Sequence, residues 1–293
     1  MRKFKWYWLA PLLIVLVLLT GCKQQPAEHR GQQLNVVTSL KVYQEAASAV
    51  LGKYGHASAI ISSPDIDPHD FEANTKTARQ IADADIVIAN GLGYDDWLNK
   101  LTTAANDDSK FVSVASDVLH KPAGANEHVF YDPTMMPKLS HYLARRFGKL
   151  QPQHAAYFDK QAANYIKSLQ PLYDEINRLK NRGRGEYAAS SEPVFDYALQ
   201  AAGFKLTATH FAKAIEDGTD PSPQDLAELQ GQIKSGKLAV FVVNVQEESG
   251  LVSTVEKQAQ RADVKIVRVR ETQPAGKNYM QWMLSNYQQM DIK

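Results

Sequence analysis

The chain has 293 residues, which is long enough for two domains of ordinary size. Its 33 Lys and Arg nearly balance its 32 Asp and Glu, and this argues against a nucleic-acid-binding protein, which needs a strong basic excess. Cys22 is the only cysteine, so the composition excludes a disulfide framework and a thiolate metal site.

The first 21 residues predict a signal peptide of the lipoprotein type. Three basic residues precede an apolar run at 6–19, and these 14 residues are fewer than the roughly 20 that a membrane-spanning helix needs. The letters LTGC at 19–22 resemble a bacterial lipobox, so we expect cleavage before Cys22 and lipidation of its side chain. An uncleaved anchor is the alternative. Residues 22–33 then read as the lipidated cysteine and a polar tether, and the mature chain keeps 30 basic against 32 acidic residues, a balance of −2.

Residues 34–150 alternate between strand and helix patterns, which predicts an α/β lobe with a mainly parallel sheet. The expected strands are 34–39, 57–62, 85–90 and 110–116, and the expected helices are 41–53, 77–84 and 94–105. A second series fills residues 182–293 and predicts a second α/β lobe of the same kind. Its expected strands are 186–191, 205–210, 238–244 and 265–270, and its expected helices are 194–202, 222–236, 252–262 and 278–290.

Between the lobes, residues 151–181 predict one long connecting helix. An apolar seam with spacings of 4 and 3 residues marks one helical face: Phe158, Ala162, Tyr165, Leu169, Leu172, Ile176 and Leu179. A helix over 153–180 would be roughly 40 Å long at 1.5 Å per residue and could brace both lobes. Pro171 lies inside it and should kink or split it.

Four polar side chains lie at or near strand ends, where ligands bind in open α/β sheets. His69 follows strand 57–62, Glu192 follows strand 186–191, Glu271 follows strand 265–270, and His128 precedes a helix that starts near Asp132. Taken singly, each fits an ordinary surface residue as well as a ligand. Together, two neutral imidazoles and two carboxylates carry a charge of −2, which neutralises a divalent cation. Mixed nitrogen and oxygen ligands suit Zn²⁺, Mn²⁺ or Fe²⁺.

Two other histidines, His120 and His210, are reserve candidates for metal binding. The segment "NGLGYDDW" at 90–97 lacks the third glycine of a dinucleotide-binding loop, and we interpret it as a structural turn. The chain has neither a phosphate-binding Walker motif nor a Gly-x-Ser-x-Gly nucleophile elbow. These observations do not point to an enzyme.

Five segments, taken in order, resemble the metal-binding lipoproteins of bacterial ABC importers, the zinc/manganese solute-binding family also called cluster A-I or TroA-like. The segments are "DPHDFE" (67–72), "NGLGYDDW" (90–97), "EHVFYDP" (127–133), "SEPVFDY" (191–197) and "ETQPAGKNYMQWM" (271–283). The resemblance covers the chain from about residue 34 onward. It implies two α/β lobes joined by one long rigid helix, with a metal ion buried between the lobes.

By position, the resemblance makes His69, His128, Glu192 and Glu271 the metal ligands. Glu192 falls where manganese binders usually have Glu and zinc binders often have His, whereas Glu271 falls where the family usually has Asp. The His-rich loop of many zinc binders is short here, at 120–127. Ligand preference favours Mn²⁺ and the Irving–Williams order favours Zn²⁺. We therefore expect Mn²⁺ as the transported metal, with Zn²⁺ as the alternative.

The implied protein is a monomer, anchored outside the cytoplasm to the bacterial membrane by Cys22. It would deliver its metal to an ABC permease and a cytoplasmic ATPase, with no catalysis and no nucleic-acid partner. Two other classes stay open. A surface adhesin would need an exposed recognition patch. A metal-dependent hydrolase would need an open coordination position for water.

Overall fold

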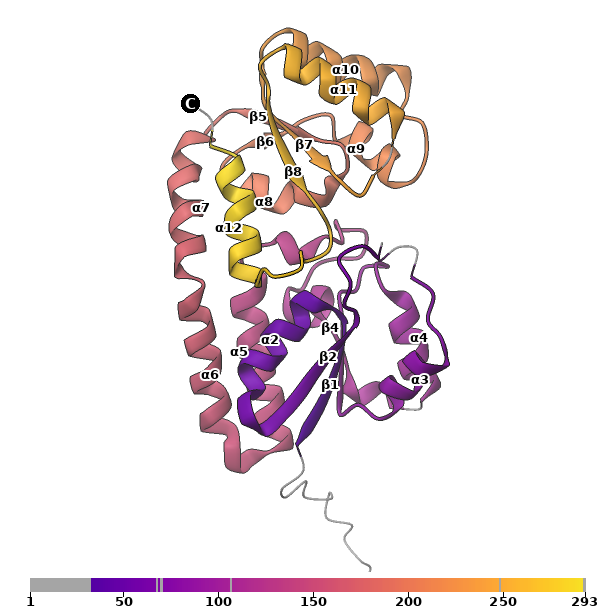
Figure 1. Ribbon diagram of the computed structural model, residues 1–293, viewed down its shortest axis with the longest axis vertical. Coiled ribbons are helices and arrows are strands. Elements are labelled where there is room, and N and C mark those ends of the chain that lie inside the picture. The colour runs from indigo at the N-terminus through magenta and orange to yellow at the C-terminus, as the bar shows by residue number, and fades with distance from the viewer. Residues whose placement is uncertain (1–32, 67, 69–70, 106, 248, 292–293) are drawn as a thin grey trace, which may run out of the picture. The chain divides into compact units, whose positions relative to one another are not determined.

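The computed structural model describes residues 33–66, 68, 71–105, 107–247 and 249–291, and these contain two four-stranded sheets (Figure 1). All strand pairs in both sheets are parallel. The first sheet has the order β2-β1-β3-β4, with β1 (Leu34–Leu40), β2 (Gly55–Ile61), β3 (Ile86–Ala89) and β4 (Phe111–Ser113). The second has the matching order β6-β5-β7-β8, with β5 (Tyr187–Ser190), β6 (Lys205–Leu206), β7 (Leu238–Asn244) and β8 (Lys265–Val269). The predicted α/β class with two parallel sheets is confirmed.

Helices connect the strands of each sheet and follow the last strand of each. In the first half these are α2 (Lys41–Leu51), α3 (Thr75–Ala82), α4 (Asp96–Ala104) and α5 (Met135–Leu150). In the second half they are α8 (Asp196–Ala201), α9 (Thr209–Glu216), α10 (Pro223–Lys234), α11 (Gly250–Arg261) and α12 (Tyr279–Gln289). Side-chain caps start several of them: Asn74 and Asn278 form reciprocal capping boxes at α3 and α12, and the Ser222 hydroxyl accepts from the Asp225 N–H at α10.

The long helix expected between the lobes is present as α6 (Ala155–Ser168) and α7 (Gln170–Arg182), which follow each other with Leu169 between them. Pro171 is in the first turn of α7, where its missing N–H is tolerated. The break therefore falls where the proline predicts it. All residues of the predicted apolar seam except Tyr165 are buried. Helix α6 packs against α2 and α5, and α7 packs against α12 (Figure 1), so the two segments brace elements of both halves.

One apolar cluster runs through both halves of the described chain. It contains side chains from the inner faces of both sheets and from α2, α5, α6, α7 and α12. In β7, Val240 and Val242 belong to this shared cluster, whereas Phe241 and Val243 pack against the outer helices α9, α10 and α11. This alternation follows from the two-residue period of a strand. The inner faces of the two sheets are thus held in one core.

Most of the predicted boundaries differ from the observed ones by one or two residues, and two predicted strands end well before the predicted residue. The strand expected at 110–116 stops at Ser113 and continues as a π-helical turn, Val114–Val118, because the Asp117 carboxylate and the Ser113 hydroxyl capture local N–H groups. The strand expected at 205–210 stops at Leu206, and α9 begins at Thr209. Phe211, Ala212 and Ile215 recur at helical spacing and are buried, and this packing outweighs the strand preference of the threonines nearby.

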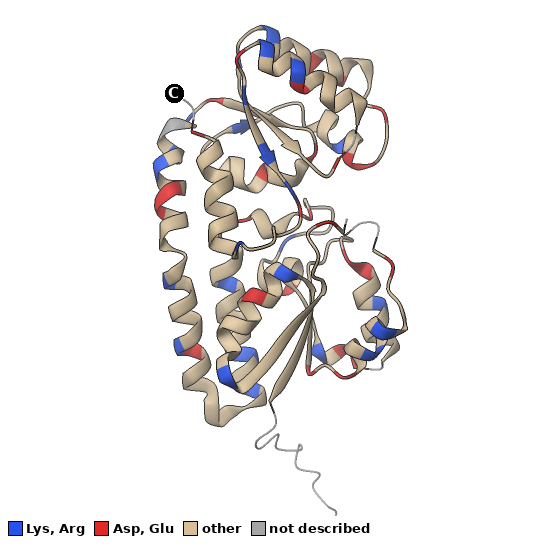
Figure 2. Cartoon of the chain, viewed as in Figure 1, with Lys and Arg blue, Asp and Glu red and all other residues tan. Residues whose placement is uncertain are grey.

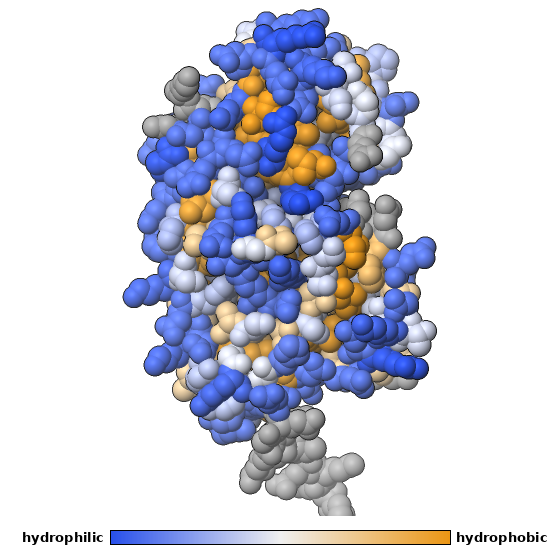
Figure 3. Space-filling model, viewed as in Figure 1, coloured by the Kyte–Doolittle hydropathy of each residue, from blue (hydrophilic) through white to orange (hydrophobic). Residues whose placement is uncertain are grey.

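Charged residues of both signs are interspersed over the two halves (Figure 2), in keeping with the near-neutral net charge. The visible surface is mostly hydrophilic, with apolar side chains gathered beside β8 and in a second group lower in the view (Figure 3). Within the described ranges, no helix combines the length and the apolar character needed to cross a membrane.

Candidate metal site

Three polar side chains lie at the carboxyl ends of neighbouring strands of the second sheet. Asn244 is the last residue of β7, while Glu192 lies two residues beyond β5 and Glu271 two residues beyond β8. Strands β5 and β7 are adjacent although β6 separates them in sequence, so this is the switch point at which open α/β sheets bind ligands. All three side chains are buried, with relative exposures of 8% for Glu192, 5% for Glu271 and 3% for Asn244.

The amide of Asn244 joins the two carboxylates. Its Nδ2 donates to Oε2 of Glu192 at 2.6 Å and to Oε1 of Glu271 at 3.0 Å. Its Oδ1 accepts from the Gln246 N–H at 3.2 Å, and this contact orients the amide so that the nitrogen faces the carboxylates. Gln246 also accepts the backbone N–H of Glu271 at 2.7 Å through its side-chain oxygen. The last residue of β7 therefore holds both acids, and Gln246 in the loop after it also holds the backbone of Glu271.

His128 reaches the same place from the first half of the chain. It is 1% exposed, and its Nε2 lies 3.5 Å from Oε2 of Glu271. On the other side of the ring, Nδ1 lies 3.0 Å from Oδ1 of Asn126. The Asn126 oxygen also accepts the His128 N–H at 2.8 Å, while its Nδ2 donates to the Pro193 carbonyl at 2.6 Å. Because the Asn126 oxygen can only accept, this network places a proton on Nδ1, and Nε2 faces the carboxylate of Glu271.

Tyr94 adds a donor from the turn that follows β3. Its hydroxyl donates to Oε2 of Glu271 at 3.0 Å. Three successive residues before it, Gly91, Leu92 and Gly93, have positive φ angles of 89°, 58° and 89°. The carboxylate of Asp95 fastens this turn by accepting the N–H of Gly91 at 2.9 Å. The segment interpreted as a structural turn is one, and it also delivers a tyrosine to a candidate ligand.

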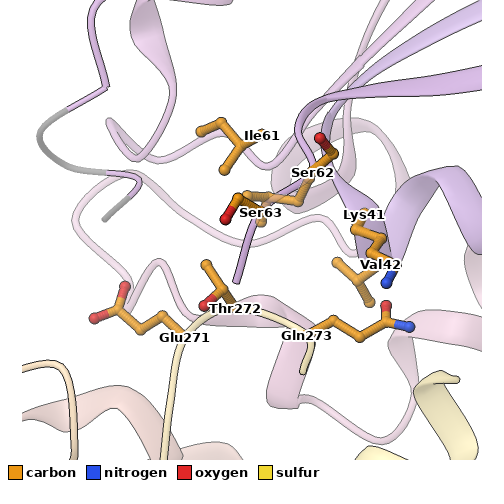
Figure 4. Close-up of a pocket in the computed structure, with 9 residues that line it drawn as sticks. Lys41, Val42, Ile61, Ser62, Ser63, Glu271, Thr272 and Gln273 are labelled. Carbon is orange, nitrogen blue, oxygen red and sulfur yellow. The ribbon is translucent and has the colours of Figure 1, made fainter. Parts of the chain in front are cut away.

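The loop that carries Glu271 is tied to the first half of the chain. Thr272 Oγ1 donates to the Pro64 carbonyl at 2.6 Å. Glu45 on α2 accepts from Gln273 Nε2 at 3.1 Å and from the Tyr279 N–H at 2.7 Å through one carboxylate oxygen. Figure 4 shows the segment from Glu271 to Gln273 lying across from Ile61–Ser63 and from Lys41 and Val42, which line a small pocket with it. Elements of both halves thus fix the position of Glu271.

Burial makes the acids around this site hard to ionise. It raises the pKa of Glu192 to about 7, with the charge of Glu271 adding to the rise and the Asn244 amide opposing it. Burial also raises the pKa of Asp196 to about 7 and raises that of Glu216. A divalent cation would reverse this cost, because it favours the ionised form of every carboxylate it contacts.

The carboxylates around His128 raise the pKa of its imidazole, so they favour its charged form. Burial lowers its pKa, but the carboxylates of Glu271, Glu216 and Glu127 outweigh burial and hold the pKa above its ordinary value. Ligand atoms of Glu127, His128 and Glu216 all lie within 4.8 Å of one another, and Glu216 Oε1 is 3.6 Å from Nδ1. Because Nδ1 donates its proton to Asn126, these two acids lie on the outer side of the ring, opposite the Nε2 side that faces Glu271.

The structure brings together three of the four predicted ligands: His128, Glu192 and Glu271. The fourth, His69, lies outside the described residues, as do the signal peptide, Cys22 and the tether. The reserve candidates do not join this group: His120 is exposed, with Nδ1 3.1 Å from the Ser116 carbonyl, and His210 is exposed at the start of α9.

Four residues near the site were not predicted to contribute: Tyr94, Asn126, Glu216 and Asn244. Asn244 ends a predicted strand, so the strand-end rule that selected Glu192 could have found it. Glu216 depended on recognising α9 from the spacing of its apolar residues. Asn126 and Tyr94 carry no local signal, since their roles arise only from contacts with distant residues.

A family model described as "Zinc-uptake complex component A periplasmic", ZnuA, matches residues 36–291. The zinc-binding lipoprotein AdcA of Streptococcus pneumoniae is 24% identical over 92% of this chain, which spans 57% of the length of AdcA. The manganese-binding lipoprotein MntA of Bacillus subtilis is 26% identical over 85% of this chain and 83% of its own length.

The fold is also that of solved structures. A Mn-bound periplasmic metal binding protein from Candidatus Liberibacter asiaticus superposes with a TM-score of 0.73 at 15% identity, over 88% of this chain and 98% of that one. This likeness concerns the fold alone. The family model covers most of the chain, including all eight strands except the first two residues of β1. The chain therefore belongs to the ZnuA family of periplasmic zinc-uptake components.

Proposed function

We propose that this protein captures a divalent transition metal, Zn²⁺ or Mn²⁺, outside the cytoplasm and delivers it to an ABC importer made of a permease and an ATPase. The convergence of His128, Glu192 and Glu271 from both halves of the chain carries the proposal. Imidazole and carboxylate groups are the donors that these metals accept. The names of AdcA and MntA support metal as the cargo.

The proposed ligands are His128 through Nε2, Glu192, Glu271 and, from the sequence, His69. With two neutral imidazoles and two ionised carboxylates, the site would neutralise the charge of the ion. Distances near 2.0–2.2 Å are expected for zinc. Hydrogen bonds from Tyr94 and Asn244 would orient the carboxylates of Glu271 and Glu192. Asn126 would orient the imidazole of His128 through its Nδ1.

The anchoring and the lobe boundaries are part of the same proposal. Residues 1–21 would be removed, Cys22 would carry the lipid, and 22–33 would tether a monomer to the membrane. Residues 34–150 and 182–293 would be the two lobes, with 151–181 connecting them. The word lipoprotein in the names of both relatives supports the anchor.

We do not propose catalysis. A catalytic zinc site keeps one coordination position for water or substrate, whereas four protein ligands would fill a tetrahedral ion. We also prefer metal delivery to the surface-adhesin alternative, because the family match concerns zinc uptake. If the protein hydrolysed a substrate in a metal-dependent way and His128→Ala lost this activity, the conclusion against catalysis would be wrong.

Thermal unfolding of the chelator-stripped protein tests the proposal, with Zn²⁺ and Mn²⁺ titrated separately. A ligand at 100 times its Kd adds about 2.7 kcal/mol to the native state. At roughly 2–4 °C per kcal/mol for a chain of this size class, the midpoint should rise by about 5–11 °C.

Variants locate the metal that causes the shift. His69→Ala, His128→Ala and Glu271→Ala should each abolish it at the same metal concentration. His120→Ala is the matched control, since His120 is exposed and bonded elsewhere, and it should keep the full shift. The absence of any shift in the wild-type protein would contradict the proposal.

A further inference from the structure

The bridge made by Asn244 engages one oxygen of each candidate carboxylate. A side-chain amide nitrogen has two hydrogens, and here one points to Glu192 Oε2 and the other to Glu271 Oε1. Oε2 of Glu271 is the oxygen that lies 3.5 Å from His128 Nε2. The two oxygens of Glu271 therefore differ: Oε1 faces the Asn244 amide and Oε2 faces the His128 imidazole.

Asn244 is firmly held in this orientation. Its backbone N–H donates to Ser191 Oγ at 3.0 Å, and its Oδ1 accepts from the Gln246 N–H. At 3% exposure, its Nδ2 hydrogens would find little water if the carboxylates turned away. A buried donor left without an acceptor is costly, and hydrogen bonds to charged groups are among the stronger ones in proteins.

We propose that Asn244 is a specificity-determining residue, which restricts Glu192 and Glu271 to one metal-binding oxygen each and so favours Zn²⁺ over Mn²⁺. This inference rests on the proposed metal-binding function. A bidentate carboxylate would need Glu192 Oε2 or Glu271 Oε1 to leave the amide. The bridge opposes that step, and the two acids together supply two oxygens instead of four.

The number of oxygens matters because the two metals differ in coordination. Zinc is satisfied by four nitrogen or oxygen ligands in a tetrahedron. Manganese prefers more oxygens and commonly takes six ligands. Since the Irving–Williams order makes Zn²⁺ bind more tightly than Mn²⁺ at most sites, the informative quantity is the ratio of the two affinities, compared between variants.

The experiment measures this ratio by competition with a chelating dye, for the full chain purified in detergent. Asn244→Ala removes both donors and should lower the preference for zinc over manganese about tenfold, because manganese can then recruit the released oxygens. Asn244→Ser keeps one donor and should fall between. Asn286→Ala is the control: Asn286 is also a buried asparagine, but its amide donates to Tyr131, and this variant should keep the wild-type ratio.

X-ray absorption on the wild-type protein provides a second readout. We expect four nitrogen or oxygen neighbours around zinc. An unchanged ratio in folded Asn244→Ala would overturn the inference and leave metal binding intact. If neither Asn244→Ala nor Asn244→Ser folds, the wild type decides: five or six neighbours around zinc would overturn the inference, and four would support it. Failure of the wild type to bind either metal would refute the proposed function itself.

Discussion

Glu192 should make the metal-stripped protein less stable as the pH rises, and Glu192→Gln should remove this effect. Burial raises the pKa of Glu192 from 4.5 to about 7 in the folded chain. A carboxyl group with a raised pKa favours the folded state fully below 4.5, and this contribution is lost as the pH rises through 7, because the unfolded chain ionises more easily. Each pH unit between the two pKa values is worth about 1.4 kcal/mol, so ionisation costs the fold about 3 kcal/mol by pH 8.

The substitution isolates this carboxyl group. Glutamine does not ionise but keeps an oxygen for the Asn244 amide, so the bridge can survive. Asp196, whose pKa is also raised to about 7, contributes equally to both proteins and cancels in their difference. Between pH 5 and 8, the wild type should therefore lose about 2.5 kcal/mol more unfolding free energy than Glu192→Gln, because a small part of the loss has already occurred at pH 5.

Urea unfolding in the presence of a chelator, at pH 5, 6, 7 and 8, measures the two profiles. Excess Zn²⁺ at pH 8 should stabilise the wild type more than Glu192→Gln, because a bound metal ion would favour the ionised carboxylate that destabilises the stripped protein. If the difference in unfolding free energy between wild type and variant changed by less than about 1 kcal/mol from pH 5 to pH 8, the assignment of Glu192 as a buried acid with a raised pKa would be refuted.

Four further substitutions test the surroundings of the site. Tyr94→Phe removes the donor to Glu271 and should weaken metal binding about tenfold in competition titrations, as is typical for groups that support ligands; unchanged affinity would exclude this role. Glu45→Gln weakens the hydrogen bonds from Gln273 and Tyr279, which follow Glu271, and a third from the Tyr165 hydroxyl on α6, and it should lower the unfolding free energy by about 1–3 kcal/mol in urea; a smaller loss would mean that the Glu271 loop is held elsewhere. Gly91→Ala and Gly93→Ala should each destabilise by about 1–3 kcal/mol, since both glycines have φ near 89°. Gly91→Ala should be the worse, since its new Cβ would meet a β4 side chain at 2.2 Å whereas nothing lies within 4 Å at Gly93; equal losses would contradict the close contact.

Much of the fold could be predicted because its patterns are local. The apolar strands of both sheets alternate with helices, and the seam from Phe158 to Leu179 marks a helical face without reference to any partner. Pro171 indicated the break between α6 and α7 for a purely steric reason. The failure at residues 205–210 occurred where two local signals compete, and burial of Phe211 and Ile215 decided for the helix.

The site could be predicted only in part. The strand-end rule selects Glu192 and Glu271 because it needs only the predicted end of each strand. The role of Asn244 depends on β5, β7 and β8 lying side by side, which no local pattern states. An uncharged asparagine also carries no signal of its own for metal binding, and its importance follows from the two acids that it joins.

Anomalous X-ray diffraction at the zinc absorption edge, on crystals of the protein grown with Zn²⁺, would locate the metal ion among the proposed ligands. We expect one strong anomalous peak about 2.0–2.2 Å from His128 Nε2, with Glu271 Oε2 and Glu192 also in contact. A peak on the opposite side of the imidazole, among Glu127, Glu216 and Nδ1 of His128, would contradict this expectation. So would a peak that touches neither His128 nor either of the two glutamates.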